Sequence, residues 1–561
     1  MNLSQKKREE LLAFLRKLRE EHNDDASIIA FNEIENELTS KKYGLVWEEH
    51  SEEVDEQIKT QVPVFRNLLE RTIMSDETLP FNFLLEGDNL HSLKLLEKTH
   101  KGKIDVIYID PPYNRGKDDF IYNDCMIGLE DGFRHSKWLS FMERRLSIAK
   151  SLLRDDGVIF ISIDDNEQAT LKLLCESIFG EKNFVSQLVW EKKKKGSFLS
   201  KSITNIKEYI LVFAKNIQMF KGLVGELNNK TETYPCINAV NKRELRYIPR
   251  GIKSNYKELD YFLPSGSEIS YTTMSIVLHS DLVIKDGYLA EDLTVEGNWR
   301  YSQSAMYEYA QKGELYLTHG LYLRRIVNDT RIKMMKDLLP RTGDDVNLSY
   351  NSEIDINNLF SSGWGSNEDA DEELRVLFNK QKLFDYPKPT RLLIKLFASY
   401  KKENAIILDF FAGSGTTAQA VMELNKQDGG NRRFILCTNN ENGICENITY
   451  QRIKTVITGK RADGSEWGDG IPANLKYFKT DYIAKASDDI EYCVGDNLLH
   501  HIAEMVELQH GTDIDNDKHI LVLTDEEADN LTEEQLANCE ELYISSSVLL
   551  TAEQEKMFKR L

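Results

Sequence analysis

Residues 105–114 read Asp-Val-Ile-Tyr-Ile-Asp-Pro-Pro-Tyr-Asn, and this stretch decides the fold. The apolar run at 106–109 does not alternate with polar residues, which indicates a strand buried on both faces, as in a parallel sheet flanked by helices. Two prolines end the strand, because neither can donate to a ladder. We therefore expect residues 110–113 to be held rigidly at the carboxyl edge of the sheet, where open α/β sheets bind ligands.

The four residues of this loop, Asp110, Pro111, Pro112 and Tyr113, suit a planar group that carries an exocyclic amine. The Asp110 carboxylate and the Pro111 carbonyl can accept the two N–H bonds of such an amine, and Tyr113 can stack on the ring. A strand that merely ends in a turn would contain the same residue types. A second motif has to decide between these two interpretations.

That second motif is the glycine-rich segment at 408–417, Leu-Asp-Phe-Phe-Ala-Gly-Ser-Gly-Thr-Thr. Residues 405–408 predict another buried strand, and 416–424 predict the helix that follows. Gly413 and Gly415 between them allow a tight turn and a close approach of the backbone to a ligand. No Gly-Lys-Ser/Thr follows, so the loop is not a triphosphate-binding Walker loop. With Asp409 just upstream, it fits an adenosine ligand that lacks phosphates.

Together the two motifs resemble those of the amino-methyltransferases of DNA, which use S-adenosylmethionine. The catalytic motif comes first and the cofactor motif about 300 residues later, which is the permuted order of that family's beta group. Residues 114–124 look like the extended loop of the modification subunits of Type III restriction systems, and residues 384–390 resemble their cofactor-tail motif. Residues 42–48 also resemble a block of this group, and the likeness spans roughly residues 40–480.

The resemblance implies an α/β protein with a Rossmann-like methyltransferase sheet in circularly permuted motif order. It also implies an inserted target-recognition domain, a helical N-terminal extension and an α/β C-terminal extension. The expected regions are an N-terminal helical region at 1–75, the catalytic half at 76–215, the target-recognition insertion at 216–380, the cofactor half at 381–475 and an acidic domain for subunit contacts at 476–561.

The resemblance also assigns a set of cofactor-binding residues. In the family, the turn at Asp88 and Asn89 lies beside the cofactor's adenine, although Asp and Asn are equally favoured as simple helix caps. A helix start at 387–390 favours an anion such as the methionine carboxylate. The full set is Asp88, Asn89, Lys388, Pro389, Thr390, Asp409, Phe411, Gly413, Gly415, Thr416 and Glu441. Glu441, the ribose candidate, stands about three places later than in many relatives. The seven cysteines form no CxxC pair, so we expect no metal site and reduced thiols.

The net charge of −21 looks wrong for a protein that binds DNA, but the charge is unevenly distributed. Residues 481–561 contain 20 acidic and 5 basic residues, whereas residues 192–215 contain seven lysines and one glutamate. A lysine run is usually a solvated surface. Its place beside the expected substrate cleft instead favours phosphate contacts by Lys192, Lys193, Lys194 and Lys195.

Other segments carry weaker signals. The runs at 185–190 and 209–213 predict a hairpin at one edge of the sheet, and 368–373 predicts a solvated acidic loop. Strand-like runs at 519–523 and 542–545 predict that the acidic tail is folded. A helical apolar stripe at 11–18 is expected to pack against either the same chain or a partner subunit. In the insertion, Arg243, Arg246, Arg250, Arg324 and Arg325 are candidates to read guanines.

The predicted reaction is methyl transfer from S-adenosylmethionine to adenine N6 in double-stranded DNA, with the target base flipped out of the helix. The resemblance further implies a homodimer and a separate restriction subunit with helicase and nuclease activity. The alternatives are a stand-alone methyltransferase of adenine N6 or cytosine N4, and a DNA-binding specificity subunit without activity. No 18-residue apolar run and no signal peptide is found, so we expect a cytoplasmic protein without a membrane segment.

Overall fold

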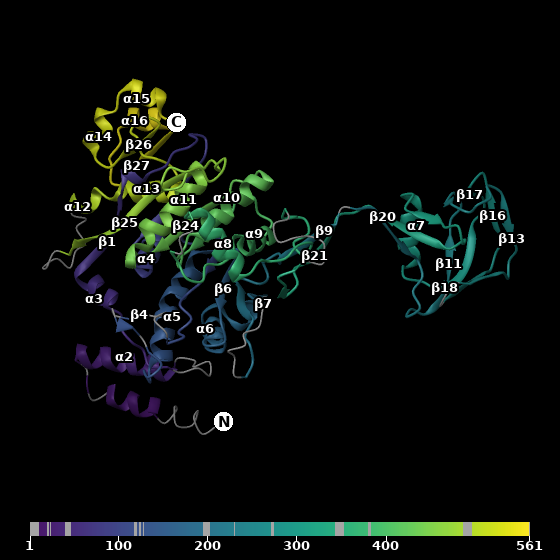
Figure 1. Cartoon of the computed structure of the whole chain (residues 1–561), viewed down its shortest axis with the longest axis horizontal. Helices are drawn as coiled ribbons and strands as arrows, with labels where there is room; N and C mark the ends of the chain where they lie inside the picture. Colours follow the sequence, from purple (N-terminus) through teal and green to yellow (C-terminus); the bar gives the residue numbers. More distant parts are fainter. Residues whose placement is uncertain are drawn as a thin grey trace. The chain divides into compact units, whose positions relative to one another are not determined.

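The computed structural model divides the chain into two units, residues 1–223 with 336–561, and residues 224–335. The larger unit contains both motifs (Figure 1). The structure describes residues 11–19, 22, 24–39, 47–116, 121–122, 125–126, 128–193, 202–228, 230–270, 274–342, 353–379, 383–485 and 496–559.

A ten-stranded sheet forms the centre of the larger unit. In spatial order its strands are β1 (Gln61–Asn67), β25 (Asn474–Ala484), β2 (Phe81–Glu86), β24 (Arg433–Thr438), β23 (Ile406–Asp409), β3 (Ile104–Ile109), β6 (Leu153–Ile163), β8 (Lys207–Ala214), β7 (Phe184–Glu191) and β22 (Leu338–Leu339). The strands from β25 to β6 run parallel to one another. The predicted hairpin is confirmed, because β7 and β8 pair antiparallel, and β22 adds one more strand outside β7.

The strands that precede the two motifs are neighbours at the centre of this sheet. Val106 of β3 pairs with Ile407 of β23, and Ile107 pairs with Leu408. From β23 the chain continues to β24 on one side, and from β3 it continues to β6 on the other. The strand order therefore reverses between β23 and β3, and such a switch point is where open α/β sheets form their ligand crevice.

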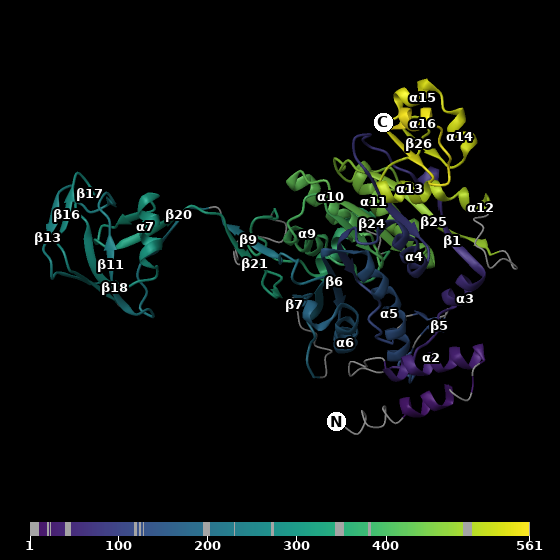
Figure 2. The same cartoon turned by 180° about the vertical axis from the view of Figure 1, so that it is seen from behind.

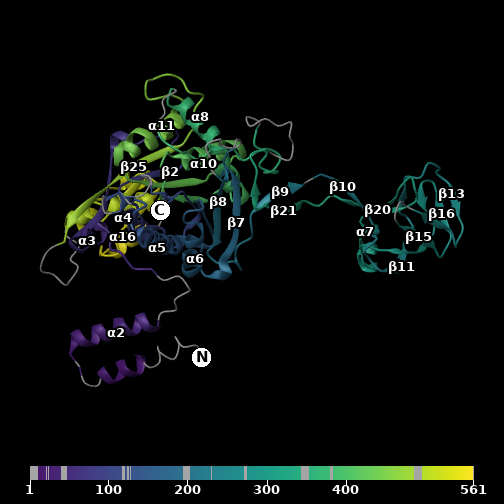
Figure 3. The ribbon, with the colours of Figure 1, turned by 60° about the horizontal axis from the view of Figure 1, so that its bottom comes forward.

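Helices cover both faces of the sheet, as Figure 3 shows. On one face α4 (Asn89–His100), α5 (Arg134–Leu152) and α6 (Gln168–Phe179) share a core with Ile107 and Ile109 of β3. On the other face lie α9 (Thr390–Ser399), α10 (Thr416–Asp428) and α11 (Tyr450–Thr458), and Phe397 of α9 packs edge-on against Tyr108 at 6.4 Å. Both faces of β3 are thus buried, as its unbroken apolar run predicts. None of the described helices combines the length and apolarity needed to cross a membrane.

The N-terminal region is only partly helical, and the prediction for 1–75 is wrong at β1. Residues 11–19, α2 (Asp25–Thr39) and α3 (Glu53–Thr60) are helical, but β1 pairs antiparallel with β25. Val62, Val64 and Phe65 favour a strand, and Pro63 is tolerated there because β1 is the edge of the sheet. In the apolar stripe at 11–18, Leu15 is buried whereas Leu11 and Phe14 are exposed.

The segment expected to be a loop at 368–373 is also helical. It lies in α8 (Asn367–Leu377), whose N-terminus is closed by a capping box between Ser366 and Asp369. The acidic residues that predicted a solvated loop therefore stabilise a first helical turn, where negative charge is favoured.

The acidic tail is folded, as predicted. Its two strands, β26 (His519–Val522) and β27 (Glu541–Ile544), pair in parallel beside α14 (Asp525–Asn530), α15 (Glu533–Asn538) and α16 (Ala552–Phe558), and Figure 2 shows this region in yellow. The buried side chains of Ile520, Val522 and Ala528 give it a small core of its own. In the sequence, α12 (Asp496–Leu499) and α13 (Ile502–His510) come between β25 and β26. The buried Lys476 of β25 forms an ion pair with Glu507 of α13 at 2.5 Å.

The smaller unit lies within the predicted insertion and is mainly β-structure. Its seven-stranded sheet has the order β10 (Glu232–Pro235), β20 (Leu323–Val327), β19 (Leu315–Leu317), β12 (Lys253–Ser254), β17 (Tyr288–Leu289), β16 (Leu282–Lys285) and β13 (Tyr261–Leu263). A second sheet has β11 (Arg243–Ile248), β18 (Leu293–Asn298), β15 (Ser275–Leu278) and β14 (Glu268–Ser270), and α7 spans Gln303–Gln311. The unit begins and ends with two paired strands, β9 (Val224–Asn228) and β21 (Arg331–Met334). Two candidate base readers are held by carboxylates, Arg243 by Glu296 at 2.9 Å and Arg325 by Glu314 at 3.0 Å.

A buried ion pair joins the N-terminal segment to the core of the larger unit. Both terminal nitrogens of Arg145 donate to Glu52, at 2.8 and 3.0 Å, and its Nε donates to Asn89 at 2.5 Å. The Arg145 side chain is fully buried. A guanidinium taken out of water is stable only where its donors are satisfied, so Glu52 is required for the local fold.

Replacing Glu52 with Gln should therefore lower the free energy of unfolding by about 3–5 kcal/mol, because it leaves the buried Arg145 with only the more distant and more exposed Asp88, at 3.6 Å, as a counterion. Urea denaturation measures the change, with Glu53→Gln at the neighbouring exposed position as the matched control. A loss below about 1 kcal/mol would show that the pair contributes little.

Candidate active site

The loop of Asp110, Pro111, Pro112 and Tyr113, called the catalytic loop after the motif that it resembles, lies at the carboxyl end of β3 and is fixed by hydrogen bonds. The Tyr113 hydroxyl donates to one Asp110 oxygen at 2.7 Å, and the Lys388 ammonium donates to the other at 2.6 Å. The indole N–H of Trp138 donates to the Pro112 carbonyl at 2.7 Å. No described donor reaches the carbonyl of Pro111, so this acceptor remains available beside the Asp110 carboxylate.

The residue after the loop turns the chain sharply. Asn114 has φ +56°, in the left-handed region that asparagine tolerates better than most residues. Its side-chain amide donates to the fully buried Glu167 at 2.6 Å. The loop is thus anchored at both ends, and its rigidity comes from its neighbours as well as from the two prolines.

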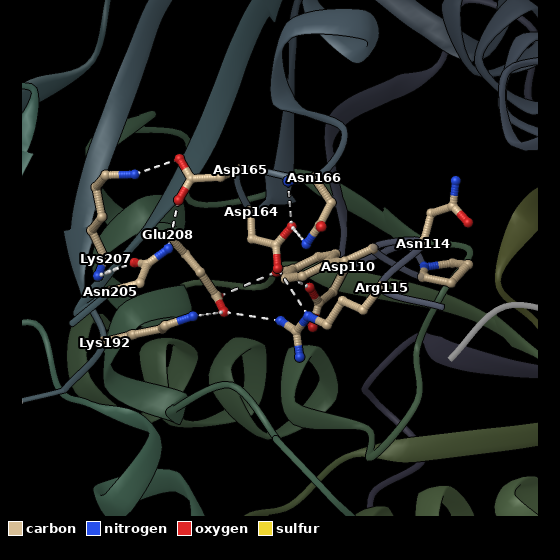
Figure 4. Close-up of polar contacts among 12 residues, drawn as sticks. Asp110, Asn114, Arg115, Asp164, Asp165, Asn166, Lys192, Asn205, Lys207 and Glu208 are labelled. Carbon is tan, nitrogen blue, oxygen red and sulfur yellow. Dashed lines mark hydrogen bonds and ion pairs between the residues drawn. The ribbon is translucent and has the colours of Figure 1, made fainter. Parts of the chain in front are cut away.

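A network of charges that the sequence did not reveal surrounds Asp110, and Figure 4 shows it at close range. Asp164 follows β6, and Glu208 lies on β8. Arg115 contacts both, at 2.8 Å to Asp164 and 3.5 Å to Glu208. Lys192, which follows β7, contacts Glu208 at 2.9 Å. Lys192 and Lys388 were candidates from the sequence for other roles, whereas Asp164, Glu208 and Arg115 were not singled out.

Burial and charge act against each other on the groups of this network. Burial alone would raise the pKa of Glu208, but the Lys388 and Lys192 ammonium groups outweigh it and the pKa is lowered. Burial would lower the pKa of Lys388, but Asp110 and Glu208 outweigh it and the pKa is raised. Burial raises the pKa of Tyr113 well above its ordinary value, and the negative charges of Asp110 and Glu208 add to this effect. The site therefore contains a protonated phenol between two carboxylates.

The glycine loop lies at the end of β23, next to the catalytic loop. Gly413 and Gly415 have φ +49° and +76°, a conformation that favours glycine. The Thr449 hydroxyl donates to the Gly413 carbonyl at 2.6 Å. A Cβ at Gly415 would lie 3.2 Å from the Thr449 methyl, so the loop is packed closely against the π-helix at Cys445–Thr449.

A buried arginine braces the same loop. Arg452 of α11 donates to Thr416 at 2.8 Å, to the Ser414 hydroxyl at 3.2 Å and to Thr390 at 3.0 Å. It thereby connects the glycine loop to the start of α9. Phe411 packs against Phe141 of α5, with ring centroids 5.9 Å apart.

Asp409 ends β23 as a fully buried carboxyl group. It accepts hydrogen bonds from the Phe411 amide at 3.0 Å and the Thr417 hydroxyl at 2.6 Å. Burial raises the pKa of Asp409 from 3.8 to about 7, more than these two hydrogen bonds lower it.

Asp88 is the N-cap of α4 and Asn89 is its first residue. They follow β2, which lies on the opposite side of β23 from β3 in the sheet. One Asp88 oxygen accepts the Leu90 amide at 2.7 Å, so Asp88 is the helix cap that its residue type favours. Asn89 donates to the Phe410 carbonyl at 2.8 Å, which joins α4 to the glycine loop.

The other predicted cofactor residues are arranged differently from the expectation. Pro389 is the N-cap of α9, but the Thr390 amide and hydroxyl donate to Glu373 at 3.0 and 2.8 Å. The helix start therefore already contacts a carboxylate of the chain, and the Lys388 ammonium points to Asp110. Glu441 is exposed, in a short 3₁₀ helix after β24.

The predicted lysine run is only partly described. Lys192 is largely buried against Glu208, whereas Lys193 is half-buried. Lys194 and Lys195 lie outside the described residues.

With this geometry established, comparison with known proteins identifies the family. Residues 104–450 match the family model described as DNA methylase, which covers more than half of the chain and includes both loops. This chain belongs to the DNA methylase family.

Named relatives of this methylase fall in two groups. It is 33% identical over 415 residues to the Mod subunit of the Type III restriction-modification enzyme StyLTI from Salmonella typhimurium, covering 69% of this chain and 57% of the relative. It is 31% identical over 447 residues to the EcoPI Mod subunit of Escherichia phage P1, covering 72% and 65%. It is also 31% identical over 376 residues to the Type II methyltransferase M.KpnI from Klebsiella pneumoniae, covering 65% and 82%. The methylase thus spans less than two thirds of the length of the two Mod subunits.

Solved structures resemble the methylase at low identity. A complex of M1.HpyAVI with SAM is 14% identical, with a TM-score of 0.28, and covers 66% of this chain and 98% of that one. The cytosine-N4-specific PvuII DNA methyltransferase is 10% identical, with a TM-score of 0.32, and covers 67% and 91%. The strand order described above, rather than these scores, defines the fold.

The raised pKa of Asp409 predicts a pH dependence of stability. The folded protein retains this proton up to about pH 7, while the unfolded chain loses it near 3.8. The free energy of unfolding should therefore fall as the pH rises from about 4 to 7, by up to about 4 kcal/mol at about 1.4 kcal/mol per pKa unit. Asp409→Asn should remove this part of the slope in denaturation measured across that range. An unchanged slope would mean that Asp409 is ionised in the folded protein.

Proposed function

We propose that this methylase transfers a methyl group from S-adenosylmethionine to the N6 amine of adenine in double-stranded DNA. The observation that carries the proposal is the pairing of β3 with β23, which brings the Asp-Pro-Pro-Tyr loop and the glycine loop to one point of the sheet edge. The loop that can accept an amine and the loop that suits an adenosine then lie side by side, at the sheet edge where such folds bind ligands.

The glycine loop fits an adenosine cofactor without phosphates. Two left-handed glycines precede α10, and a Cβ at Gly413 would lie only 3.3 Å from the Phe384 ring, so the turn favours glycine. The loop carries no lysine of the kind that holds a triphosphate in a Walker loop. Asp88, Asn89, Phe411, Gly413, Gly415 and Thr416 are the residues we assign to the cofactor. S-adenosylmethionine supplies the reactive methyl group when bound.

The chain's own contribution to the chemistry is to capture and orient an amine. The exocyclic amine of adenine is a poor nucleophile, because its lone pair is delocalised into the ring. Asp110 and the Pro111 carbonyl present two acceptors for its two N–H bonds. Accepting both favours the tetrahedral nitrogen that can attack, and such orientation can supply about 7–11 kcal/mol of the barrier reduction.

The base has to leave the double helix to reach this loop, at a cost of a few kcal/mol. Stacking on Tyr113 would return about 1–3 kcal/mol. In the structure the Arg115 guanidinium lies 4.8 Å from the centre of the Tyr113 ring, and the ring is largely buried. Base stacking therefore requires Arg115 to move or the opposite face of the ring to open.

Incubation of the methylase with DNA and labelled S-adenosylmethionine should produce N6-methyladenine, identified by mass spectrometry of the nucleosides. Asp110→Ala should reduce the yield by at least about 100-fold, because one of the two amine acceptors is lost. Cofactor affinity measured by calorimetry should change less than about threefold. Asp155→Ala, an exposed acid at the opposite edge of the sheet, is the matched control.

Each other outcome assigns a different function. Methylation of cytosine N4 would place the chain with the cytosine-specific enzymes. DNA binding without methylation would make it a specificity subunit. Full activity of Asp110→Ala would refute the mechanism.

We further propose that the methylase acts as the modification subunit of a Type III restriction-modification system. Its similarity to two Mod subunits supports this assignment. The 561 residues contain no Walker loop, so cleavage driven by ATP would require a separate restriction subunit. The match to M.KpnI, which covers 82% of that Type II enzyme, supports the alternative of a methyltransferase that acts alone. We assign target recognition to the smaller unit and subunit contacts to the apolar stripe at 11–18 and the acidic tail.

The Type III proposal predicts that the purified chain is a dimer in light scattering and methylates one strand of an asymmetric site. It should not cut DNA by itself. Sequencing of modified bases in DNA from a host that expresses the chain gives the site and the strand. A monomer that methylates both strands of a palindrome would assign it to the stand-alone enzymes instead.

A further inference from the structure

Three neighbouring strands place a carboxylate at the same edge of the sheet. Asp110 follows β3, Asp164 follows β6, and Glu208 is the second residue of β8, which runs in the opposite direction. Figure 4 shows the three carboxylates close together, with basic side chains between them. The Glu208 side chain is only 4% exposed, although it is ionisable.

Lys388 is the cation that connects Glu208 to the catalytic loop. Its ammonium lies 2.6 Å from Asp110 and 3.6 Å from Glu208, and its side chain is 7% exposed. The Tyr113 hydroxyl connects the same two carboxylates, at 2.7 Å to Asp110 and 3.2 Å to Glu208. Glu208 thus contacts both groups that donate to Asp110.

This arrangement creates a conflict for the proposed reaction. The target amine must donate to Asp110 and gains positive charge as it attacks the methyl group. Lys388 already places a full positive charge at that carboxylate, and two cations on one carboxylate repel each other strongly in a buried site. The attack is favoured only if the ammonium has a second carboxylate to which it can move.

We propose that Glu208 is a positioning residue for methyl transfer, which holds Lys388 between two carboxylates and takes over its ammonium when the target amine occupies Asp110. The inference rests on the proposed function and adds a residue to it. The ammonium needs to move by about one ångström or less to come within hydrogen-bonding distance of Glu208, since it starts at 3.6 Å. Lys192 and Arg115 hold Glu208 in place from the other side.

Glu208→Gln tests this role because it keeps the shape of the side chain and removes its charge. The rate of a single turnover, at saturating DNA and S-adenosylmethionine, should fall by about 10- to 100-fold, the usual effect of losing a charge-assisted hydrogen bond. The cofactor dissociation constant should stay within about twofold. Glu208→Asp, which retains the carboxylate on a shorter side chain, should recover part of the rate.

Asp165→Asn is the matched control. Asp165 lies at the same sheet edge and is an acid that pairs with Lys207 at 2.6 Å rather than with Lys388. Its substitution should leave the rate unchanged. A general loss of negative charge at the edge would instead slow both variants equally.

A second measurement needs neither DNA nor methyl transfer. Acylation of Lys388 by acetic anhydride, followed by mass spectrometry across a pH series, reports how tightly its ammonium is held. Asp110 and Glu208 together raise the pKa of Lys388, so Glu208→Gln should shift its acylation midpoint to lower pH. Asp165→Asn should leave the midpoint where it is. A purely structural role of Glu208 would lower the melting temperature without this selective shift.

A slower Glu208→Gln with a lowered Lys388 midpoint supports the inference. A wild-type rate in Glu208→Gln overturns it while the unmodified protein remains active. If the glutamine variant does not fold, a wild-type rate in Glu208→Met, which is also uncharged and of similar size, overturns it. An unshifted Lys388 midpoint overturns it as well. Absence of methylation by the unmodified protein would instead overturn the proposed function. The failure of the Glu208 inference and the failure of the proposed function are thereby distinguished.

Discussion

The parallel pairing of β3 with β23 is the contact on which the candidate active site depends. The two strands lie about 300 residues apart in the sequence, and two matched pairs of residues fix their register. A shift of one residue would turn the side chains of one strand to the opposite face. Because both faces of the centre of the sheet are packed beneath helices, such a shift would place side chains of the wrong size and shape against each helix layer and is disfavoured. The relative position of the two loops thus follows from the packing of the core.

Around this contact the protein gathers carboxylates and basic side chains in matched numbers, most of them largely buried. Asp110, Asp164 and Glu208 face Lys388, Arg115 and Lys192, and the distances between opposite charges lie between 2.6 and 3.6 Å. Buried ion pairs contribute little to stability, because the loss of hydration offsets their attraction. Their benefit at a reaction site is different: dipoles and charges that are already oriented need no rearrangement when charge develops on the reacting atoms. The cluster is therefore better explained by chemistry than by stability.

The sequence predicted those parts of the site that rest on local backbone chemistry. Prolines after an apolar run predicted the loop at the end of β3, and glycines between a strand and a helix predicted the loop at the end of β23. The sequence did not reveal Glu208, because a glutamate in an edge hairpin becomes informative only when strand pairing brings it to Asp110, 98 residues earlier in the chain. The same limit explains Thr390: its helix start suggested an anion site, but a carboxylate from the preceding helix already lies there. At β1, edge position and pairing with β25 decide the structure, and neither can be seen within the segment itself.

The smaller unit starts and finishes on β9 and β21, which are hydrogen-bonded neighbours. The two ends of the insert therefore lie side by side. The entropic cost of closing a loop grows only slowly with the number of residues, so the length of the insert has little effect on the larger unit. The sheet that carries the two loops can therefore accept a different insert at this point without relocating its own strands. On our proposal that the smaller unit recognises the target, replacing the whole insert would change the DNA sequence that is recognised and leave the two loops in place.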